Sequence, residues 1–255
     1  MTIADLHRTF TLDSVSDGAL VPVLSAMAAA GDLDGKRGFE EAMVHVIETC
    51  GDSPADGWHA FYVNSLAELR AGTVDFARIH RQALSLLSGS SVLEVGSCFG
   101  LFALQCVQDG HVVDACDICP GAVERLADES LRLGLPLTPR IGDARALPYP
   151  DRSVDTVTLI HLLEHLEPGD VAMAITEAVR VARRRVVIAV PFEDEPSEHF
   201  GHLVSLSEED LLTWAAPWVR CGVRATVFTD CGGWLVLDVA PCFESGQIKP
   251  RLLAT

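Results

Sequence analysis

The fold is decided by one stretch of the sequence, Val92-Leu93-Glu94-Val95-Gly96-Ser97-Cys98-Phe99-Gly100. Its apolar start predicts a buried strand, its glycines predict a tight turn, and residues 101–107 predict a helix. Such a turn lets the backbone approach a ligand closely, and the helix start offers unpaired N–H groups. The G-x-G-x-x-G pattern of dehydrogenases fails, because its third and sixth positions are Cys98 and Leu101. Such a turn alone does not identify its ligand, and the residues that follow it must decide.

Short β-branched runs alternate with amphipathic helices after residue 91, which is typical of a doubly wound α/β fold with a mostly parallel sheet. The first five predicted strands are residues 92–95, 111–115, 137–141, 154–160 and 185–190. Segments 223–229 and 234–240 flank the turn at 230–233, and they predict an antiparallel hairpin that ends a seven-stranded sheet. The N-terminal part instead predicts helices at residues 19–30, 38–49, 57–71 and 75–87. We therefore expect a helical N-terminal extension over 1–88 and a Rossmann-like domain over 89–255.

Two acidic positions follow the glycine turn at informative places. Asp117 closes the second predicted strand, where a carboxylate can accept hydrogen bonds from both hydroxyls of a ribose. In isolation it could equally be a solvated residue at a strand end. The third predicted strand is followed by Gly142-Asp143-Ala144-Arg145-Ala146-Leu147-Pro148, and then by Asp151, Ser153 and Asp155. This second run makes the functional interpretation of Asp117 stronger.

The run from Gly142 to Asp155 resembles the "GDA-x-x-LP-x-x-D-x-S-x-D" motif of Rossmann-type, class I S-adenosylmethionine-dependent methyltransferases. The likeness covers roughly residues 91–190. It implies S-adenosylmethionine as methyl donor and S-adenosylhomocysteine as product, with the methionine part in the glycine turn, the ribose at Asp117 and the adenine at Asp143 and the Ala144 N–H. The family commonly has a second glycine where this chain has Cys98, which should narrow the space beside the methionine part. The cofactor-binding residues that the resemblance implies are Glu94, Gly96, Ser97, Cys98, Gly100, Asp117, Ile118, Asp143, Ala144, Ile160 and His161.

The segment His161-Leu162-Leu163-Glu164-His165 matches the H-x-x-E-H pattern of one class of zinc peptidases. Its place just after the fourth predicted strand favours a different role, since methyltransferases of this type often carry a similar segment there. Glu164 and His165 would then support the loop under the cofactor, with His165 also a candidate for substrate contact. His161 stands at the carboxyl end of the strand, where ligands bind in open α/β sheets. We assign no metal ligands here.

The loop after the fifth predicted strand, residues 191–202, is acidic and rich in histidine, and loops in this position often carry function. Residues 207–210 then predict a capping box that opens another helix. An alcohol acceptor benefits from a base, because a neutral hydroxyl is a poor nucleophile. The candidate catalytic residues are His199, His202, His161 and Asp194. A carboxylate pair with a histidine could also hold a divalent metal.

Three further stretches resemble a narrower family, the mycofactocin oligosaccharide methyltransferases: residues 61–66, 96–100 and 198–202. The resemblance implies O-methylation of a glucose hydroxyl, at O-2, on the oligoglucose attached to a peptide-derived redox cofactor. Trp58 and Tyr62 could stack on such a sugar, and we take them with His165 as substrate-binding candidates. An equally open interpretation is a helix that packs its aromatic stripe into the core.

Composition limits the choice of partners. The formal charge of −17 argues against nucleic acid, because phosphate-binding surfaces need clustered Lys and Arg. No signal peptide or membrane-spanning stretch is visible, so we expect a cytoplasmic protein that acts on a small glycosylated molecule; a homodimer stays open. The rivals are a methyltransferase for a quinone-type or other small acceptor, a module that binds S-adenosylmethionine without catalysis, and a zinc hydrolase.

Overall fold

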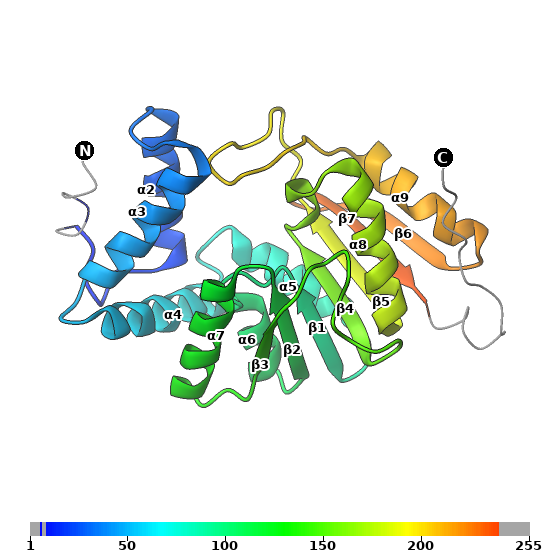
Figure 1. Ribbon diagram of the computed structural model, residues 1–255, viewed down its shortest axis with the longest axis horizontal. Coiled ribbons are helices and arrows are strands. Elements are labelled where there is room, and N and C mark those ends of the chain that lie inside the picture. Colours follow the sequence, from blue (N-terminus) through cyan, green and yellow to red (C-terminus); the bar gives the residue numbers. More distant parts are fainter. Residues whose placement is uncertain (1–5, 7–8, 240–255) are drawn as a thin grey trace.

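The computed structural model describes residue 6 and residues 9–239, and it orders them into helices around a single sheet (Figure 1). The predicted strand end at Ala240 and the outermost parts of both predicted domains lie outside the described residues. The helices are α2 (Asp17–Ala29), α3 (Gly35–Thr49), α4 (Pro54–Ala71), α5 (Phe76–Leu86), α6 (Leu101–Gln108), α7 (Pro120–Arg132), η1 (Leu163–His165), α8 (Pro168–Val181) and α9 (Glu208–Arg220). The strands are β1 (Ser91–Val95), β2 (Val112–Asp117), β3 (Thr138–Ile141), β4 (Val154–Ile160), β5 (Ala182–Val190), β6 (Arg224–Thr229) and β7 (Gly233–Asp238).

The seven strands form one sheet in the order β3-β2-β1-β4-β5-β7-β6. Strands β1 to β5 run parallel, and β7 pairs antiparallel with both β5 and β6. The predicted α/β fold with a terminal hairpin is therefore confirmed. The chain leaves β1 toward β2 on one side and returns through β4 on the other, so the crevice at the carboxyl ends of β1 and β4 is the topological switch point where such sheets bind ligands.

Local sequence explains where several helices begin and end. Helix α4 starts after Ser53, whose side chain accepts a hydrogen bond from the Asp56 N–H, and it ends at Gly72 with left-handed backbone. Helix α9 starts with the predicted capping box, in which the Asp210 carboxylate accepts from the Ser207 N–H at 2.9 Å. These caps fix the ends of the segments that flank the site.

The N-terminal helices share a core with one face of the sheet. One buried apolar cluster joins Leu20, Phe39 and Phe61 of the N-terminal helices to Phe102 and Trp234. A second cluster lies on the opposite face, beneath α8 and α9. The predicted boundary at residue 88 coincides with the change from helices to strands. The first cluster contains residues from both sides of this boundary, so the packing is continuous across it.

The loop between β5 and α9 reaches from the sheet to the N-terminal helices, as the yellow segment beside α3 in Figure 1 shows. The Phe39 ring of α3 lies 5.5 Å from the His199 ring and 5.3 Å from the Phe200 ring, measured between centroids. The helical extension therefore contacts the loop in which three of the candidate catalytic residues lie. Within residues 9–239, no helix is long and apolar enough to cross a membrane.

Candidate active site

The glycine turn after β1 has left-handed backbone at three positions. The φ angles are +73° at Gly96, +47° at Cys98 and +68° at Gly100. A Cβ at Gly100 would clash with the Leu126 side chain of α7, so glycine is needed there for packing as well as for conformation. Cys98 is exposed and adopts a conformation that costs a non-glycine residue about 1–2 kcal/mol. The departure from the family pattern at Cys98 therefore carries a backbone strain that the sequence did not indicate.

Asp117 holds this turn in place. Its Oδ2 accepts a hydrogen bond from the Cys98 N–H and its Oδ1 accepts one from the Cys119 N–H, both at 2.8 Å. A carboxylate has about four lone-pair positions, so two acceptor positions are left for ribose hydroxyls. The next residue, Ile118, exposes 66% of its surface and gives the site an apolar edge. Both features fit the predicted binding of a nucleoside beside the end of β2.

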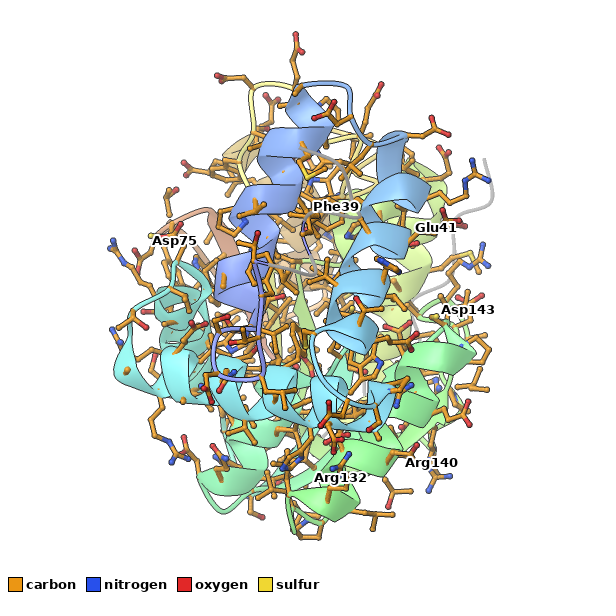
Figure 2. All side chains as sticks on the ribbon, turned by 90° about the vertical axis from the view of Figure 1, so that its left-hand side faces the viewer. Phe39, Glu41, Asp75, Arg132, Arg140 and Asp143 are labelled. Atoms are coloured by element: carbon orange, nitrogen blue, oxygen red, sulfur yellow. The ribbon has the colours of Figure 1, made fainter. Side chains whose placement is uncertain are left out.

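Asp143 is engaged by a residue that sequence reasoning did not single out. The Arg145 guanidinium donates to Asp143 through Nε at 2.9 Å and through Nη2 at 2.6 Å, while its Nη1 donates to Asp170 at 2.8 Å. These hydrogen bonds hold the pKa of Asp143 below its usual value. An adenine amino group at this place would therefore share an ionised carboxylate with Arg145. Figure 2 shows Asp143 well apart from Phe39, so the predicted adenine position and the α3 contact lie at different ends of the site.

Glu94 serves the structure of the turn. Its buried carboxylate accepts from the Ala103 N–H of α6 at 3.0 Å, which ties β1 to the helix that follows the turn. Burial raises the pKa of Glu94 to about 8. Asp155 is structural as well, since its Oδ2 accepts from the Ser90 and Ser91 N–H groups at the start of β1.

Two buried hydroxyl groups in this region have no hydrogen-bond partner among the described residues, Ser97 Oγ in the turn and Tyr62 Oη in α4. Burial raises the pKa of Tyr62 well above its ordinary value, and the nearby Cys98 adds to the shift. Buried polar atoms are normally paired, so two orphans beside one turn indicate a missing polar ligand. The carboxylate and ammonium groups of a methionine moiety would satisfy them, and the residues present thus fit the predicted cofactor.

The aromatic residues of α4 pack inward against the turn. Trp58 and Phe61 contact the Phe99 ring at centroid distances of 5.3 and 5.4 Å, and the Arg125 guanidinium lies over the Trp58 ring at 4.8 Å. Trp58 is 3% exposed and Tyr62 is fully buried. Of the two interpretations, packing of an aromatic stripe into the core describes Trp58, whereas contact of the Tyr62 hydroxyl with a ligand stays a prediction.

The carboxyl end of β4 leads into a group of histidines and carboxylates. His161 has left-handed backbone with φ of +52°, and its Nδ1 lies 3.6 Å from Glu164 Oε1. Strained backbone of this kind clusters at functional sites. Burial lowers the pKa of His161 to about 4 and raises that of Glu164 to about 8. The next residue, Leu162, packs against Gly96, which places this group beside the glycine turn.

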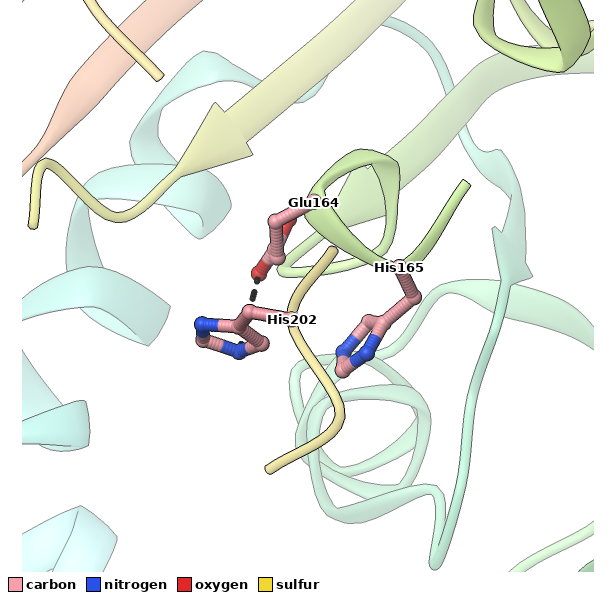
Figure 3. Close-up of side chains that lie close together, drawn as sticks. All are labelled: Glu164, His165 and His202. Carbon is pink, nitrogen blue, oxygen red and sulfur yellow. Dashed lines mark ion pairs between the residues drawn. The ribbon is translucent and has the colours of Figure 1, made fainter. Parts of the chain in front are cut away.

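The loop after β5 brings a second set of side chains to the same place. The His202 Nδ1 lies 2.6 Å from Glu193 Oε2, and its ring lies 4.9 Å from the His165 ring. The His165 Nδ1 donates to the Gly201 carbonyl at 3.1 Å. Figure 3 shows the Glu164 carboxylate pointing toward the His202 ring, with His165 beside it. The loop and the turn η1 thus form one polar cluster, which consists of His161, Glu164, His165, Glu193 and His202.

The four candidate catalytic residues lie in different environments. His161 and His202 belong to the polar cluster, whereas Asp194 is exposed. His199 packs its ring against Phe39 and Phe200, and its buried Nε2 has no partner among the described residues. Sequence reasoning missed Glu193. Its position could have indicated it, because it lies three residues after the end of β5 and directly before Asp194, the carboxylate predicted from the sequence.

Comparison with known proteins identifies the domain that carries these features. Residues 93–190 match the family model described as a methyltransferase domain. This region is therefore similar to a methyltransferase domain. The enzyme therefore transfers methyl groups and takes S-adenosylmethionine as its cofactor, as the Asp117 and Asp143 positions predicted. The match ends at the last residue of β5, so the N-terminal helices and the terminal hairpin lie outside it.

Solved structures share the architecture of this methyltransferase. A protein of Pyrococcus horikoshii OT3 is similar with a TM-score of 0.54 at 14% identity, over 67% of this chain and 91% of that one. A S-adenosylmethionine-dependent methyltransferase of Methanosarcina mazei reaches a TM-score of 0.50 at 15% identity, over 62% of this chain and 96% of that one. At these identities the similarity is one of fold. No curated protein matches the sequence.

Proposed function

We propose that this methyltransferase methylates a sugar hydroxyl on a small glycosylated molecule, a glucose of the oligosaccharide attached to mycofactocin. The observation that carries the proposal is the polar cluster beside the glycine turn, because three imidazoles and two carboxylates are suited to hydroxyl groups. The sequence resemblance at residues 61–66, 96–100 and 198–202 supports the narrower acceptor. The net charge of −17 is compatible with a neutral glycan.

S-adenosylmethionine supplies a methyl group on a positively charged sulfur, so the protein's main task is to align the acceptor with it. The acceptor oxygen forms its bond to the methyl carbon as the bond from sulfur to that carbon breaks, and the hydroxyl proton passes to a base on the protein. His161 is the base that the geometry favours. It stands at the carboxyl end of β4, and its neighbour Leu162 contacts Gly96 of the turn.

The contact between α3 and the β5–α9 loop supports a role for the N-terminal helices in covering the acceptor. Phe39 packs on both His199 and Phe200, and Lys36 lies against Gly201. Exclusion of water from a site strengthens electrostatic interactions within it. On this proposal, residues 1–88 act as a lid over the edge of the sheet where the acceptor binds.

The acceptor is tested by mass spectrometry of the glycosylated cofactor from cells with and without this protein. Loss of one methyl group per oligosaccharide in the cells without the protein supports the proposal. Purified protein, incubated with methyl-labelled S-adenosylmethionine, should add the missing methyl group to the glycan isolated from those cells. An unchanged methylation pattern rejects the sugar acceptor and leaves the methyltransferase assignment intact.

Cofactor binding is tested separately by calorimetry with Asp117→Ala. Loss of its carboxylate removes acceptors for the ribose and for two backbone N–H groups of the site. Hydrogen bonds to charged groups contribute about 1.5–3 kcal/mol each, so we expect affinity for S-adenosylmethionine to fall about 10- to 100-fold or more. Unchanged affinity would contradict the assignment of Asp117, and absence of binding by the unmutated chain would overturn the proposed function.

A further inference from the structure

Three ligand-type side chains of the polar cluster converge on one point. The Glu164 carboxylate and the His165 and His202 imidazoles each offer an atom, and these atoms lie within 4.8 Å of one another (Figure 3). Two imidazoles and one carboxylate form a ligand set that suits divalent transition metals, which coordinate nitrogen and oxygen together. Mg²⁺ and Ca²⁺ instead prefer sets made of oxygen atoms.

The outer contacts of both histidines orient them as metal ligands are oriented. The Gly201 carbonyl can only accept, so the His165 Nδ1 carries the proton in the 3.1 Å hydrogen bond between them. The Glu193 carboxylate holds a proton on the His202 Nδ1 in the same way at 2.6 Å. A neutral imidazole that carries its proton on Nδ1 has an Nε2 lone pair that can bind a metal. Metal-bound histidines characteristically donate their other N–H to a carboxylate or a backbone carbonyl.

Neither carboxylate oxygen of Glu164 accepts a hydrogen bond from the part of the chain that the structure describes. The Glu164 side chain is 1% exposed. Two imidazole nitrogens face Oε1, His161 Nδ1 at 3.6 Å and His202 Nε2 at 4.0 Å, and both lie beyond hydrogen-bonding range. A buried carboxyl group without a partner is costly to keep, since its desolvation is not offset. A cation bound between Glu164 and the two rings would offset it.

The geometry points to a binding site for one divalent transition metal ion, with Glu164, His165 and His202 as its protein ligands. Bonds of about 2.1 Å place neighbouring ligand atoms about 3.0–3.4 Å apart, so atoms now up to 4.8 Å apart must approach by up to about 1.5 Å on binding. The loop and η1 are already joined by the hydrogen bond from the Leu203 N–H to the Glu164 carbonyl at 2.8 Å.

This ligand set differs from that of the zinc peptidases whose motif the segment matches. In the peptidase pattern the first and last histidines bind the metal and the glutamate acts as a base. Here the first histidine, His161, is outside the set, and His202 from a distant loop takes its place. Glu164 itself becomes a ligand. The site thus keeps His161 for the acceptor, as the proposed function requires.

Three protein ligands leave coordination positions open for an acceptor hydroxyl, whose proton a metal makes easier to remove. The hydroxyl proton then passes to His161, the acceptor oxygen bonds to the methyl carbon, and the sulfur–carbon bond breaks. This catalytic use rests on the proposed function. Metal binding does not, and the two can fail independently.

The test is metal binding by the full-length chain without an affinity tag, stripped by a chelator and titrated with Zn²⁺ in a calorimeter. We expect one ion per chain, with Co²⁺ giving a visible absorption band that Zn²⁺ removes. Glu164→Gln and His202→Gln should lower Zn²⁺ affinity at least about 100-fold, and Glu193→Gln, which removes an outer contact, about 10- to 100-fold. Glu195→Gln, exposed on the same loop and outside the set, is the matched control and should retain the affinity.

Binding of S-adenosylmethionine by each variant reports whether its fold and cofactor site are intact. Stoichiometric metal that is lost in Glu164→Gln while the cofactor still binds supports the site. Absence of Zn²⁺ and Co²⁺ binding in the unmutated chain overturns the inference. Zn²⁺ affinity in Glu164→Gln and His202→Gln equal to that of the unmutated chain overturns it as well. Metal binding without methyl transfer to any glycan would instead reject the proposed function and leave the metal site standing.

Discussion

Single residues in the glycine turn show how a local conformation is maintained at a functional site. Cys98 has a left-handed backbone that favours glycine, yet its N–H is fixed by Asp117 at 2.8 Å. The surrounding contacts thus impose a conformation that the residue itself disfavours. The family pattern places glycine at this position, and its replacement explains part of the strain in the turn.

We predict that Cys98→Gly raises the free energy of unfolding by about 0.5–1 kcal/mol. Relief of the left-handed strain, about 1–2 kcal/mol, exceeds the entropy cost of a new glycine, about 0.5–1 kcal/mol. Urea denaturation followed by circular dichroism measures the change. Cys119→Gly is the matched control, since Cys119 has φ of −86° and its replacement relieves no left-handed strain. A gain in stability in Cys98→Gly no larger than that of the control would refute the strain.

A second residue, Glu94, makes stability depend on pH. Its folded-state pKa of about 8 exceeds the ordinary value of 4.5, so the folded chain binds more protons than the unfolded chain between these values. Its contribution to the free energy of unfolding therefore falls as pH rises through that window, by roughly 1 kcal/mol per pH unit. Glu94→Gln should lose this part of the slope, as urea unfolding across the window would show. The exposed Glu124→Gln should keep it, and parallel curves for Glu94→Gln and the unmutated chain would contradict the prediction.

At the scale of elements, periodicity and turn residues predicted the strands and helices well, and they failed where tertiary pairing decides. Strand β5 begins at Ala182, three residues before the predicted start, because α8 passes into it without a breaker. The arginines at its start look like a solvated segment in the sequence. In the fold, Arg184 pairs with Asp155 at 3.4 Å and Arg185 with Asp238 at 2.7 Å.

The candidate site, like the elements, was predictable from the sequence only where local pattern determines it. Asp117 and Asp143 follow strand ends at fixed distances along the chain, and His161 and Glu164 lie in one motif, so local pattern located them. Glu193 and Arg145 were missed because their importance lies in contacts across the fold, to His202 and Asp170. The position of Glu193 just after a strand end makes it a candidate, but spacing along the sequence does not reveal its contact with His202.

The start of α9 offers a prediction at this scale. Ser207→Ala removes the cap of the helix that follows the acceptor loop, and loss of an N-cap costs about 1 kcal/mol. We expect the melting temperature to fall by a few degrees, as calorimetry would show. Ser205→Ala, exposed and two residues earlier, should leave it unchanged. An equal fall in melting temperature in both variants would show that the helix cap is not its cause.

Across the whole molecule, the N-terminal helices and the sheet behave as one body because they share a buried apolar cluster. The cluster reaches the site from both sides, through Phe99 in the glycine turn and through Phe200 in the loop after β5. Changes in α3 should therefore affect the acceptor edge of the site more than the nucleoside edge, from which Phe39 lies well apart (Figure 2).

We predict that Phe39→Leu raises the KM for the acceptor several-fold and leaves the Kd for S-adenosylmethionine unchanged. The smaller side chain loses the ring contacts with His199 and Phe200, which fix the loop, while α4 and the turn are untouched. Steady-state kinetics and calorimetry measure the two quantities. Val44→Leu, on the exposed face of the same helix, should change neither. Equal losses of acceptor and cofactor affinity in Phe39→Leu would mean that α3 supports the whole site.

The turn that follows β1 is fixed from two directions, by the Asp117 carboxylate below it and by the Trp58 and Phe61 rings against Phe99. A loop already held in one conformation has little freedom left to lose when a ligand arrives. Preorganisation of this kind lowers the entropic penalty of association, so a larger share of the contact energy is expressed as affinity. The helices that precede the methyltransferase domain in the sequence thereby help set how tightly that domain holds its methyl donor.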